Sequence, residues 1–136
     1  MASGYSGTPL ARKLSLKGGM RVWWDGVPDA VRHEIGREGL ELLLVERPEA
    51  PIDAAHVFVT SRAAMEEKIA RLRPLLAPGG FIWVSWPKKA SGVPSDITED
   101  GIREAILPET DLVDVKVCAI DAIWSGLKLM VRRKAR

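Results

Sequence analysis

Polar side chains gather where the predicted buried strands of this chain end. In open α/β sheets, ligands bind beyond the carboxyl ends of the strands, at one edge of the sheet. We therefore expect the residues that follow these strands to share that edge, whatever the order of the strands. They are the candidate ligand-binding residues, namely Asp25, Gly26, Glu46, Thr60, Ser61, Trp86, Lys88, Lys89, Ser91 and Trp124.

Two of the loops in this set suggest an anion site. Ser61 opens a predicted helix whose free amides favour an anion, and Lys88 and Lys89 could add positive charge. The prediction is a small anionic ligand, such as a phosphate or a carboxylate, held between the two loops. In the alternative interpretation Ser61 only caps the helix, and the lysines are solvated or neutralised by Asp96 or Glu99.

The other reactive side chains suggest less chemistry. His56 lies inside an apolar run, which favours a hydrogen-bonded core histidine, and Cys118 is expected to pack rather than to react. With His33 they are too few and too scattered for a metal site, so no metal and no catalytic residue is assigned. Trp86 and Trp124 come at strand ends, where they could line a pocket or stack on a planar ligand.

Four segments predict the strands that position these residues. Met20–Trp24 is a short strand bounded by glycine at both ends, and three apolar runs follow, Leu42–Val45, Ala55–Val59 and Phe81–Trp86. Strands that are apolar on both faces belong to a parallel sheet covered by helices on each side. Between the last two runs, Arg62–Leu76 is predicted to be a helix with one apolar stripe, at Met65, Ile69, Leu72 and Leu76. The turn Pro78-Gly79-Gly80 is expected to stop this helix.

The remaining elements complete the prediction. Helices are expected over Leu10–Leu16, Pro28–Ile35 and Glu99–Leu107. Alternating residues in Leu112–Ile120 and Leu127–Arg132 predict two antiparallel strands with one wetter face, joined by a turn at Ser125-Gly126. The fold class is therefore α/β, a three-layer sandwich with a mostly parallel, Rossmann-like sheet that ends in an antiparallel hairpin.

The order of elements resembles the second half of a class I S-adenosylmethionine-dependent methyltransferase. The stretch Arg73–Val84 is similar to the part of that fold in which a helix runs through a Pro-Gly-Gly turn into a buried strand. Leu16–Val22 is similar to the lead into its first strand. The resemblance implies a shortened methyltransferase-like fold.

A second resemblance covers nearly the whole chain. Ser6–Leu10, Trp86–Gly92, Asp114–Asp121 and Trp124–Lys128 resemble a family of short bacterial proteins classed as a domain of unknown function. This resemblance brings no established activity.

The methyl-donor site of the first resemblance is only partly present. Such a site needs glycines after the first strand, yet Pro28 and Ala30 stand where glycine is preferred and only Gly26 remains. Glu46, twenty residues after Gly26, has the spacing of an acid that holds a ribose diol. The connection from Glu46 to Ala54 is too short for the βα unit usual there. These residues make S-adenosylmethionine possible but disfavoured, and the cofactor stays unknown.

Three functions follow from this pattern. The first is a non-catalytic module that binds a small ligand or regulates a partner, with a degenerate methyltransferase-like fold. The alternatives are a minimal S-adenosylmethionine-dependent methyltransferase and a protein-interaction module. Because the missing unit would leave Leu42–Val45 at the sheet edge, we also predict either a homodimer through this edge or an N-terminal arm lying over it.

Composition sets the broad class. The 136 residues predict a single α/β domain, with an arm at residues 1–9 and a basic tail at residues 132–136. Twenty basic and 18 acidic residues give a net charge of +2, which is too balanced to indicate a nucleic-acid partner. The chain has no apolar run of membrane-spanning length, a polar start without a secretory signal and a single cysteine. These features predict a cytoplasmic protein.

Overall fold

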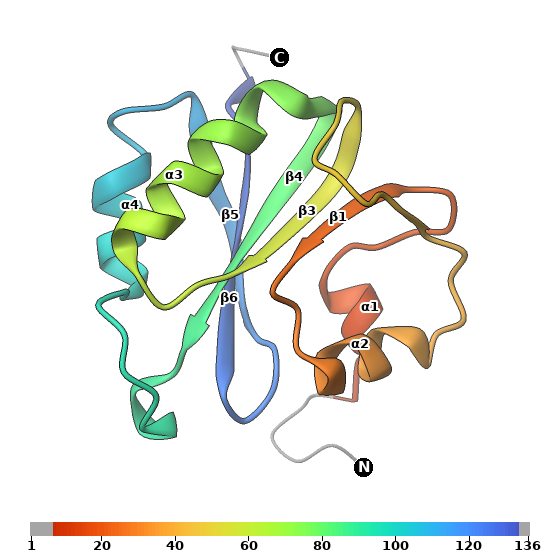
Figure 1. Cartoon of the computed structure of the whole chain (residues 1–136), viewed down its shortest axis with the longest axis horizontal. Coiled ribbons are helices and arrows are strands. Elements are labelled where there is room, and N and C mark those ends of the chain that lie inside the picture. The colour runs from red at the N-terminus through yellow and green to blue at the C-terminus, as the bar shows by residue number, and fades with distance from the viewer. Residues whose placement is uncertain (1–6, 134–136) are drawn as a thin grey trace.

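The computed structural model describes residues 7–133. Most of the predicted arm and tail, residues 1–6 and 134–136, lie outside these described residues. The described chain forms one six-stranded sheet with the order β2-β1-β3-β4-β6-β5, shown in Figure 1. The strands are β1 (Arg21–Asp25), β2 (Leu43–Leu44), β3 (Ile52–Phe58), β4 (Leu76–Pro87), β5 (Leu112–Ala119) and β6 (Trp124–Val131).

The sheet is parallel on one side and antiparallel on the other. Strands β2, β1, β3 and β4 run in the same direction, with Val22 of β1 beside Leu44 on one side and Ala54 on the other. β6 is antiparallel to both β4 and β5. This arrangement confirms the predicted mostly parallel sheet with an antiparallel hairpin at its end.

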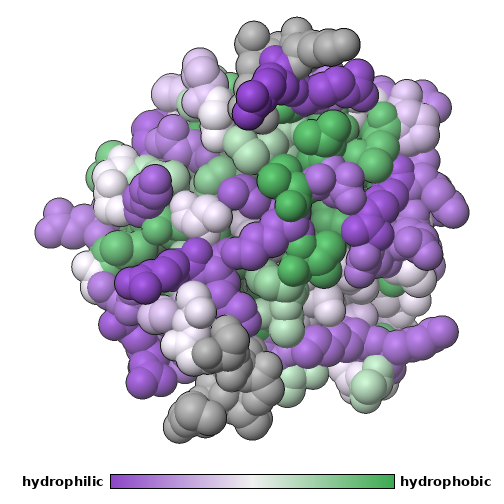
Figure 2. Space-filling view, turned by 180° about the vertical axis from the view of Figure 1, so that it is seen from behind, coloured by the Kyte–Doolittle hydropathy of each residue, from purple (hydrophilic) through white to green (hydrophobic). Residues whose placement is uncertain are grey.

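Helices cover both faces of the sheet, so the predicted three layers are confirmed. The helices are α1 (Leu10–Lys13), α2 (Asp29–Gly36), α3 (Arg62–Leu72) and α4 (Glu99–Ile106). α3 and α4 pack with one face of the sheet in one hydrophobic core, and α1 and α2 pack with the other face in a second core. α3 lies in front of the sheet in Figure 1. On the opposite side of the molecule, hydrophobic side chains remain visible between hydrophilic ones (Figure 2).

Three of the four residues predicted for the apolar stripe of α3 face the core, and the fourth, Leu76, begins β4 instead. Met65, Ile69 and Leu72 are buried, and the Ser61 hydroxyl caps the helix by accepting a hydrogen bond from the Ala64 amide at 3.2 Å. The helix ends at Leu72, earlier than predicted, and a 3₁₀ turn, η1 (Arg73–Leu75), follows. Pro74 within this turn has no amide hydrogen to continue the α-helical ladder.

The prediction that Pro78-Gly79-Gly80 stops the helix is wrong, because the helix has already ended at Leu72 and these residues lie inside β4. The chain is nevertheless irregular there, since the register with β3 shifts between Leu76 and Phe81 and Gly79 adopts a left-handed φ of 79°. Pairing of β4 with β3 already begins at Leu76, which lies beside Ile52. A Cβ atom on Gly80 would lie 2.8 Å from the Ile52 carbonyl oxygen, which is closer than a side chain can approach. Glycine is therefore needed here for a close approach of two backbones, and not for stopping a helix.

The predicted turn at Ser125-Gly126 is also wrong, because both residues lie in β6. The turn occupies residues 120–123, where the Asp121 carboxylate accepts hydrogen bonds from the amides of Ile123 and Trp124, each at 2.8 Å. A Cβ on Gly126 would come within 3.1 Å of the Trp83 ring. This glycine makes room for a core tryptophan.

The alternation predicted in the hairpin is interrupted. A register shift between Asp114 and Lys116 places an irregularity in β5, so the residues on either side of it do not share a wet face. Asp114 reaches the α4 side and bonds Arg103 at 2.7 Å, whereas the Lys116 ammonium donates to the Lys13 carbonyl of α1 at 2.9 Å. Sequence alternation could not reveal a bulge.

The predicted absence of a βα unit corresponds to an extended connection. Residues 45–51 contain no helix and lead from β2 across β1 to the start of β3 (Figure 1). β2 is consequently the edge strand.

The predicted first helix is also shorter than expected, because α1 ends at Lys13. Within residues 7–133, no helix has the length and hydropathy needed to cross a membrane.

Candidate functional site

The turn after β1 lies at the carboxyl edge of the sheet, the lower edge in Figure 1. Gly26 is exposed and adopts a left-handed φ of 73°, and a Cβ there would meet only Phe58, 3.4 Å from its carbonyl oxygen. Pro28 is the N-cap of α2, and its carbonyl accepts from the amides of Val31 and Arg32 at 3.0 Å. Pro28 therefore starts the helix, and the exposed Ala30 lies in its first turn. Pro28 and Ala30 stand where glycine was expected, but neither comes within 4 Å of a Cβ built on Gly26.

Glu46 follows β2, the strand that pairs with β1. The register pairs Val22 with Leu44, and Glu46 lies in a bend two residues further along the chain. Glu46 is exposed, and its side chain makes no ion pair within the described part of the chain. Its carboxylate is free to accept hydrogen bonds from a ligand hydroxyl.

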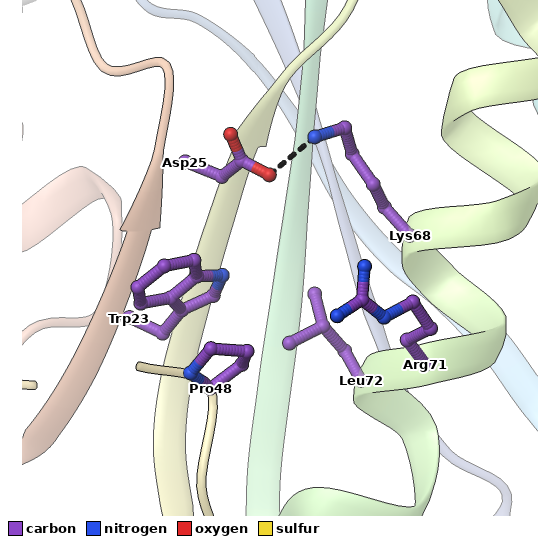
Figure 3. A pocket seen from close by; sticks show the side chains of 6 residues that line it. All are labelled: Trp23, Asp25, Pro48, Lys68, Arg71 and Leu72. Carbon is purple, nitrogen blue, oxygen red and sulfur yellow. Dashed lines mark hydrogen bonds and ion pairs between the residues drawn. The ribbon is translucent and has the colours of Figure 1, made fainter. Parts of the chain in front are cut away.

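Asp25, the last residue of β1 and a predicted ligand-binding residue, contacts α3. Its carboxylate forms an ion pair with the Lys68 ammonium of α3, and both side chains are about one third exposed. Asp25 and Lys68 form part of the lining of a cleft of about 240 Å³ between β1, α3 and the β2–β3 connection. Figure 3 shows Trp23 and Pro48 on one side of this cleft and Leu72 and Arg71 on the other.

The cleft is bounded by β1, by α3 and by the connection from β2 to β3. Its floor is the apolar face of Trp23 and Leu72, and Arg71 is the exposed cation at its rim. At 240 Å³ it is smaller than the range of roughly 300–1,000 Å³ usual for ligand pockets, so it accommodates a fragment of a drug-sized ligand rather than the whole. Sequence reasoning missed Trp23, Lys68 and Arg71 because only the strand order brings β1 beside α3. The short connection after Glu46 was the available signal.

The loop before α3 is occupied by the protein's own carboxylate. The Arg62 amide donates to the Asp96 carboxylate at 2.6 Å, and the Asp96 amide donates to the Thr60 carbonyl at 3.2 Å. Together with the Ser61 cap, these bonds use two of the amides at the start of α3 on which the anion prediction depended. Asp96 therefore competes with any anion at this position, and the predicted anion site stays a prediction.

The predicted lysine loop follows β4. Lys88 is half-buried and donates its amide to the Ile123 carbonyl at 2.7 Å, which joins this loop to the hairpin turn. Lys89 begins a short 3₁₀ turn, η2 (Lys89–Ser91), and the Ser91 hydroxyl donates to the Lys88 carbonyl at 2.6 Å. Within residues 7–133, neither lysine forms an ion pair with Asp96 or Glu99; Glu99 instead pairs with Arg103 at 2.6 Å.

The two predicted pocket tryptophans occupy different environments. Trp86 is 7% exposed and belongs to the core on the α3 and α4 side. Trp124 is half-buried and packs edge-on against Phe58, with ring centroids 5.0 Å apart. Of the two, Trp124 is the one that a ligand at the carboxyl edge could reach.

His56 is a buried core residue, as predicted. Its Nε2 atom lies 2.7 Å from the Ser85 hydroxyl, and its ring stacks on Phe58 at 4.5 Å. Burial lowers the pKa of His56 to about 3, so the ring is neutral at physiological pH. Burial also raises the pKa of the half-buried Cys118 thiol, which fits a packing role.

No protein-family model and no curated protein matches the sequence. Solved structures do match in fold. A SAM-dependent methyltransferase from Aquifex aeolicus aligns over 88% of this chain and 86% of its own, with a TM-score of 0.59 and 15% identity. The ribosomal protein L11 methylase from Lactobacillus delbrueckii subsp. bulgaricus aligns over 91% and 75%, with a TM-score of 0.56 and 12% identity.

A third similar structure contains the methyl donor. Magnesium protoporphyrin IX methyltransferase from Synechocystis PCC 6803, with bound SAM, aligns over 90% of this chain and 74% of its own, with a TM-score of 0.54 and 11% identity. The fold is thus that of the class I S-adenosylmethionine-dependent methyltransferases, here with six strands. At these identities the similarity concerns the fold.

Proposed function

We propose that this protein is a small S-adenosylmethionine-dependent methyltransferase, with the donor bound where β1 and β2 end. One observation carries the proposal: Gly26 keeps an exposed, left-handed turn between β1 and α2, and Glu46 follows the neighbouring strand. This reverses the preference from sequence for a non-catalytic module, which depended on Pro28 and Ala30 standing where glycine is preferred. In the structure Pro28 serves as the helix N-cap.

The residues at this edge fit the donor in chemical terms. A backbone without a side chain at Gly26 lets a ligand approach closely, and a carboxylate at Glu46 can accept from both ribose hydroxyls. S-adenosylmethionine, when bound, supplies an electrophilic methyl group on a sulfonium sulfur. The methyltransferase from Synechocystis PCC 6803 with bound SAM shares this fold and supports the choice of donor.

Binding is tested by the effect of the donor on thermal unfolding and by calorimetric titration. A ligand that binds only the folded state raises the unfolding midpoint. We expect both S-adenosylmethionine and its demethylated product to raise the unfolding midpoint. Glu46→Gln should raise the dissociation constant of each compound by about tenfold or more, because it removes a hydrogen bond to a charged group. Glu49→Gln, an exposed acid on the same connection, is the matched control and should bind like the wild type. Absence of any shift with both compounds would contradict the proposal.

A non-catalytic module remains the second candidate, because the absent βα unit removes part of the wall beside β2. The two functions differ in turnover. A methyltransferase converts the donor to its demethylated product when a proper acceptor is present, whereas a binding module retains it. Binding of the donor without any turnover across protein, nucleic-acid and small-molecule acceptors would favour the module.

A further inference from the structure

Two lysines face each other across the hairpin at the end of the sheet. The register of β5 and β6 sets Lys116 directly opposite Lys128. Lys128 alternates with Leu127 and Leu129, which belong to the core on the α3 and α4 side, so both lysines lie on the other face, the side of α1 and α2. This is the side of the molecule seen in Figure 2. Like charges directly opposite each other in an antiparallel pair are destabilising, so packing of the hairpin alone does not explain this pair.

The segment from α1 to β1 brings further positive charge to this pair. Burial lowers the pKa of the half-buried Lys128 ammonium, and the nearby charges of Lys116 and Lys17 lower it further. Burial raises the pKa of the Cys118 thiol, and the charges of Lys13 and Lys116 oppose this rise, which places Lys13 close to Lys116. Lys13, Lys17, Lys116 and Lys128 together form the lysine cluster.

Neutral groups hold the two hairpin lysines in place. The Lys128 ammonium donates to the Ser15 hydroxyl at 3.0 Å and lies over the Phe81 ring, 4.4 Å from its centroid. The Lys116 ammonium donates to the Lys13 carbonyl at 2.9 Å. The side chains are therefore positioned by contacts that leave their positive charge uncompensated.

The chain supplies no acid to these positions. Within residues 7–133, Lys17, Lys116 and Lys128 form no ion pair. All 18 aspartate and glutamate residues of the sequence lie in that range, so the residues outside it cannot add a carboxylate side chain. A structural role explains one of the lysines, because the carboxyl end of a helix attracts cations and Lys116 bonds the last residue of α1. It does not explain Lys17 or the half-buried Lys128.

We propose that the lysine cluster binds the phosphate group of a small phosphorylated molecule. A phosphate carries close to two negative charges at neutral pH and three acceptor oxygens, so it matches several ammonium groups better than a carboxylate does. The Ser15 hydroxyl accepts from Lys128, and no acceptor among residues 7–133 takes its own hydrogen, so this hydroxyl can donate to a phosphate oxygen. Ser15 also has a left-handed φ of 61°, a conformation that is rare for serine and is concentrated at functional sites. The near balance of the whole chain, at +2, favours a small molecule over a nucleic-acid backbone.

The lysine cluster is distinct from the proposed donor site. Its hairpin lysines lie on β5 and β6, and β3 and β4 separate these strands from β1 in the sheet. The measurements below contain no methyl donor. Phosphate binding and donor binding can therefore fail or succeed independently of each other.

Binding is tested by thermal unfolding at constant ionic strength, with chloride replaced stepwise by the phosphate compound. A ligand that binds only the folded state raises the unfolding midpoint. We expect inorganic phosphate, a sugar phosphate and a nucleoside monophosphate each to raise the midpoint at lower concentrations than chloride does. If none of the three has this effect, the proposal is wrong. Binding of a short single-stranded RNA without binding of any of the three would overturn the assignment to a small molecule.

Two substitutions locate the site. Glutamine keeps an N–H donor for the Lys13 carbonyl or the Ser15 hydroxyl but carries no charge. Lys116→Gln and Lys128→Gln should each raise the dissociation constant of phosphate about tenfold or more, because each removes a charged hydrogen-bond donor. Arg47→Gln is the control, since it removes an exposed positive charge after β2, at the opposite end of the sheet, and should bind phosphate like the wild type.

Stability without phosphate separates a binding role from a structural one. In phosphate-free buffer of low ionic strength, Lys116→Gln should leave the unfolding midpoint unchanged or raise it, because it removes the repulsion from Lys128. A lower midpoint together with an unchanged phosphate affinity would mean that Lys116 only supports α1, and would refute the proposal. Loss of the phosphate effect in Lys89→Gln, but in neither variant of the lysine cluster, would place the anion at the loop after β4 instead.

Discussion

The buried histidine of β3 makes the stability of this protein sensitive to mild acid. Burial lowers the pKa of His56 from 6.5 to about 3, so the folded protein does not take up a proton on this ring until strongly acidic pH. The unfolded chain binds a proton near pH 6.5. Between these values the unfolded state holds more protons, and the free energy of unfolding falls as the pH decreases.

The size of the loss follows from these two values. A difference of one bound proton between the unfolded and folded states changes the free energy of unfolding by about 1.4 kcal/mol for each pH unit. From pH 7.5 to pH 5, His56 alone should therefore lower the free energy of unfolding by about 2 kcal/mol. The folded ring stays neutral throughout this range, so the loss is fixed by the pKa of the unfolded state. Carboxylates with lowered pKa values, such as Asp111, contribute only at more acidic pH.

The assay is urea unfolding followed by tryptophan fluorescence at both pH values, at one protein concentration because association would add to the stability. His56→Gln keeps a group able to bond the Ser85 hydroxyl but cannot be protonated, so its stability should lose about 2 kcal/mol less than the wild type over this range. His33→Gln, an exposed histidine of α2, is the control and should behave like the wild type. If the His56→Gln protein loses as much stability as the wild type, the reasoning is refuted.

Two further substitutions test packing and charge. Gly80→Ala should lower the free energy of unfolding by about 1–3 kcal/mol, because its Cβ would lie within 3.0 Å of two backbone oxygens. Gly18→Ala is the control and should change the free energy of unfolding little, because the nearest atom to its Cβ is 3.9 Å away. Urea unfolding measures both effects. Arg73→Lys should lower the free energy of unfolding by less than about 1 kcal/mol. The Arg73 guanidinium donates two hydrogen bonds to the partly exposed Asp111 carboxylate, at 2.6 and 2.5 Å, and a lysine would donate only one of them. The hydrogen bond from Arg73 lowers the pKa of Asp111, so this difference should disappear as the pH falls below the usual range of aspartate; a loss that persists there would contradict an electrostatic role.

The candidate site was foreseeable in part. Gly26, Glu46 and the loop at Ser61 follow buried strands, and the rule that ligands bind beyond strand ends selected them before any strand order was known. The cleft formed by Trp23, Lys68 and their neighbours was not foreseeable in this way. It depends on which helix lies beside β1, and that contact joins residues more than forty positions apart.

Sequence by itself determined the class of fold, because local patterns carry that information. Continuous apolar runs predicted the parallel strands, the stripe on α3 predicted its buried face, and the short connection after Glu46 predicted an edge at β2. Only the tertiary structure decided the roles of the glycines and the surroundings of Gly26. Gly80 and Gly126 are required by atoms of other strands, and whether Pro28 blocks Gly26 or merely starts a helix depends on backbone geometry that no residue type specifies.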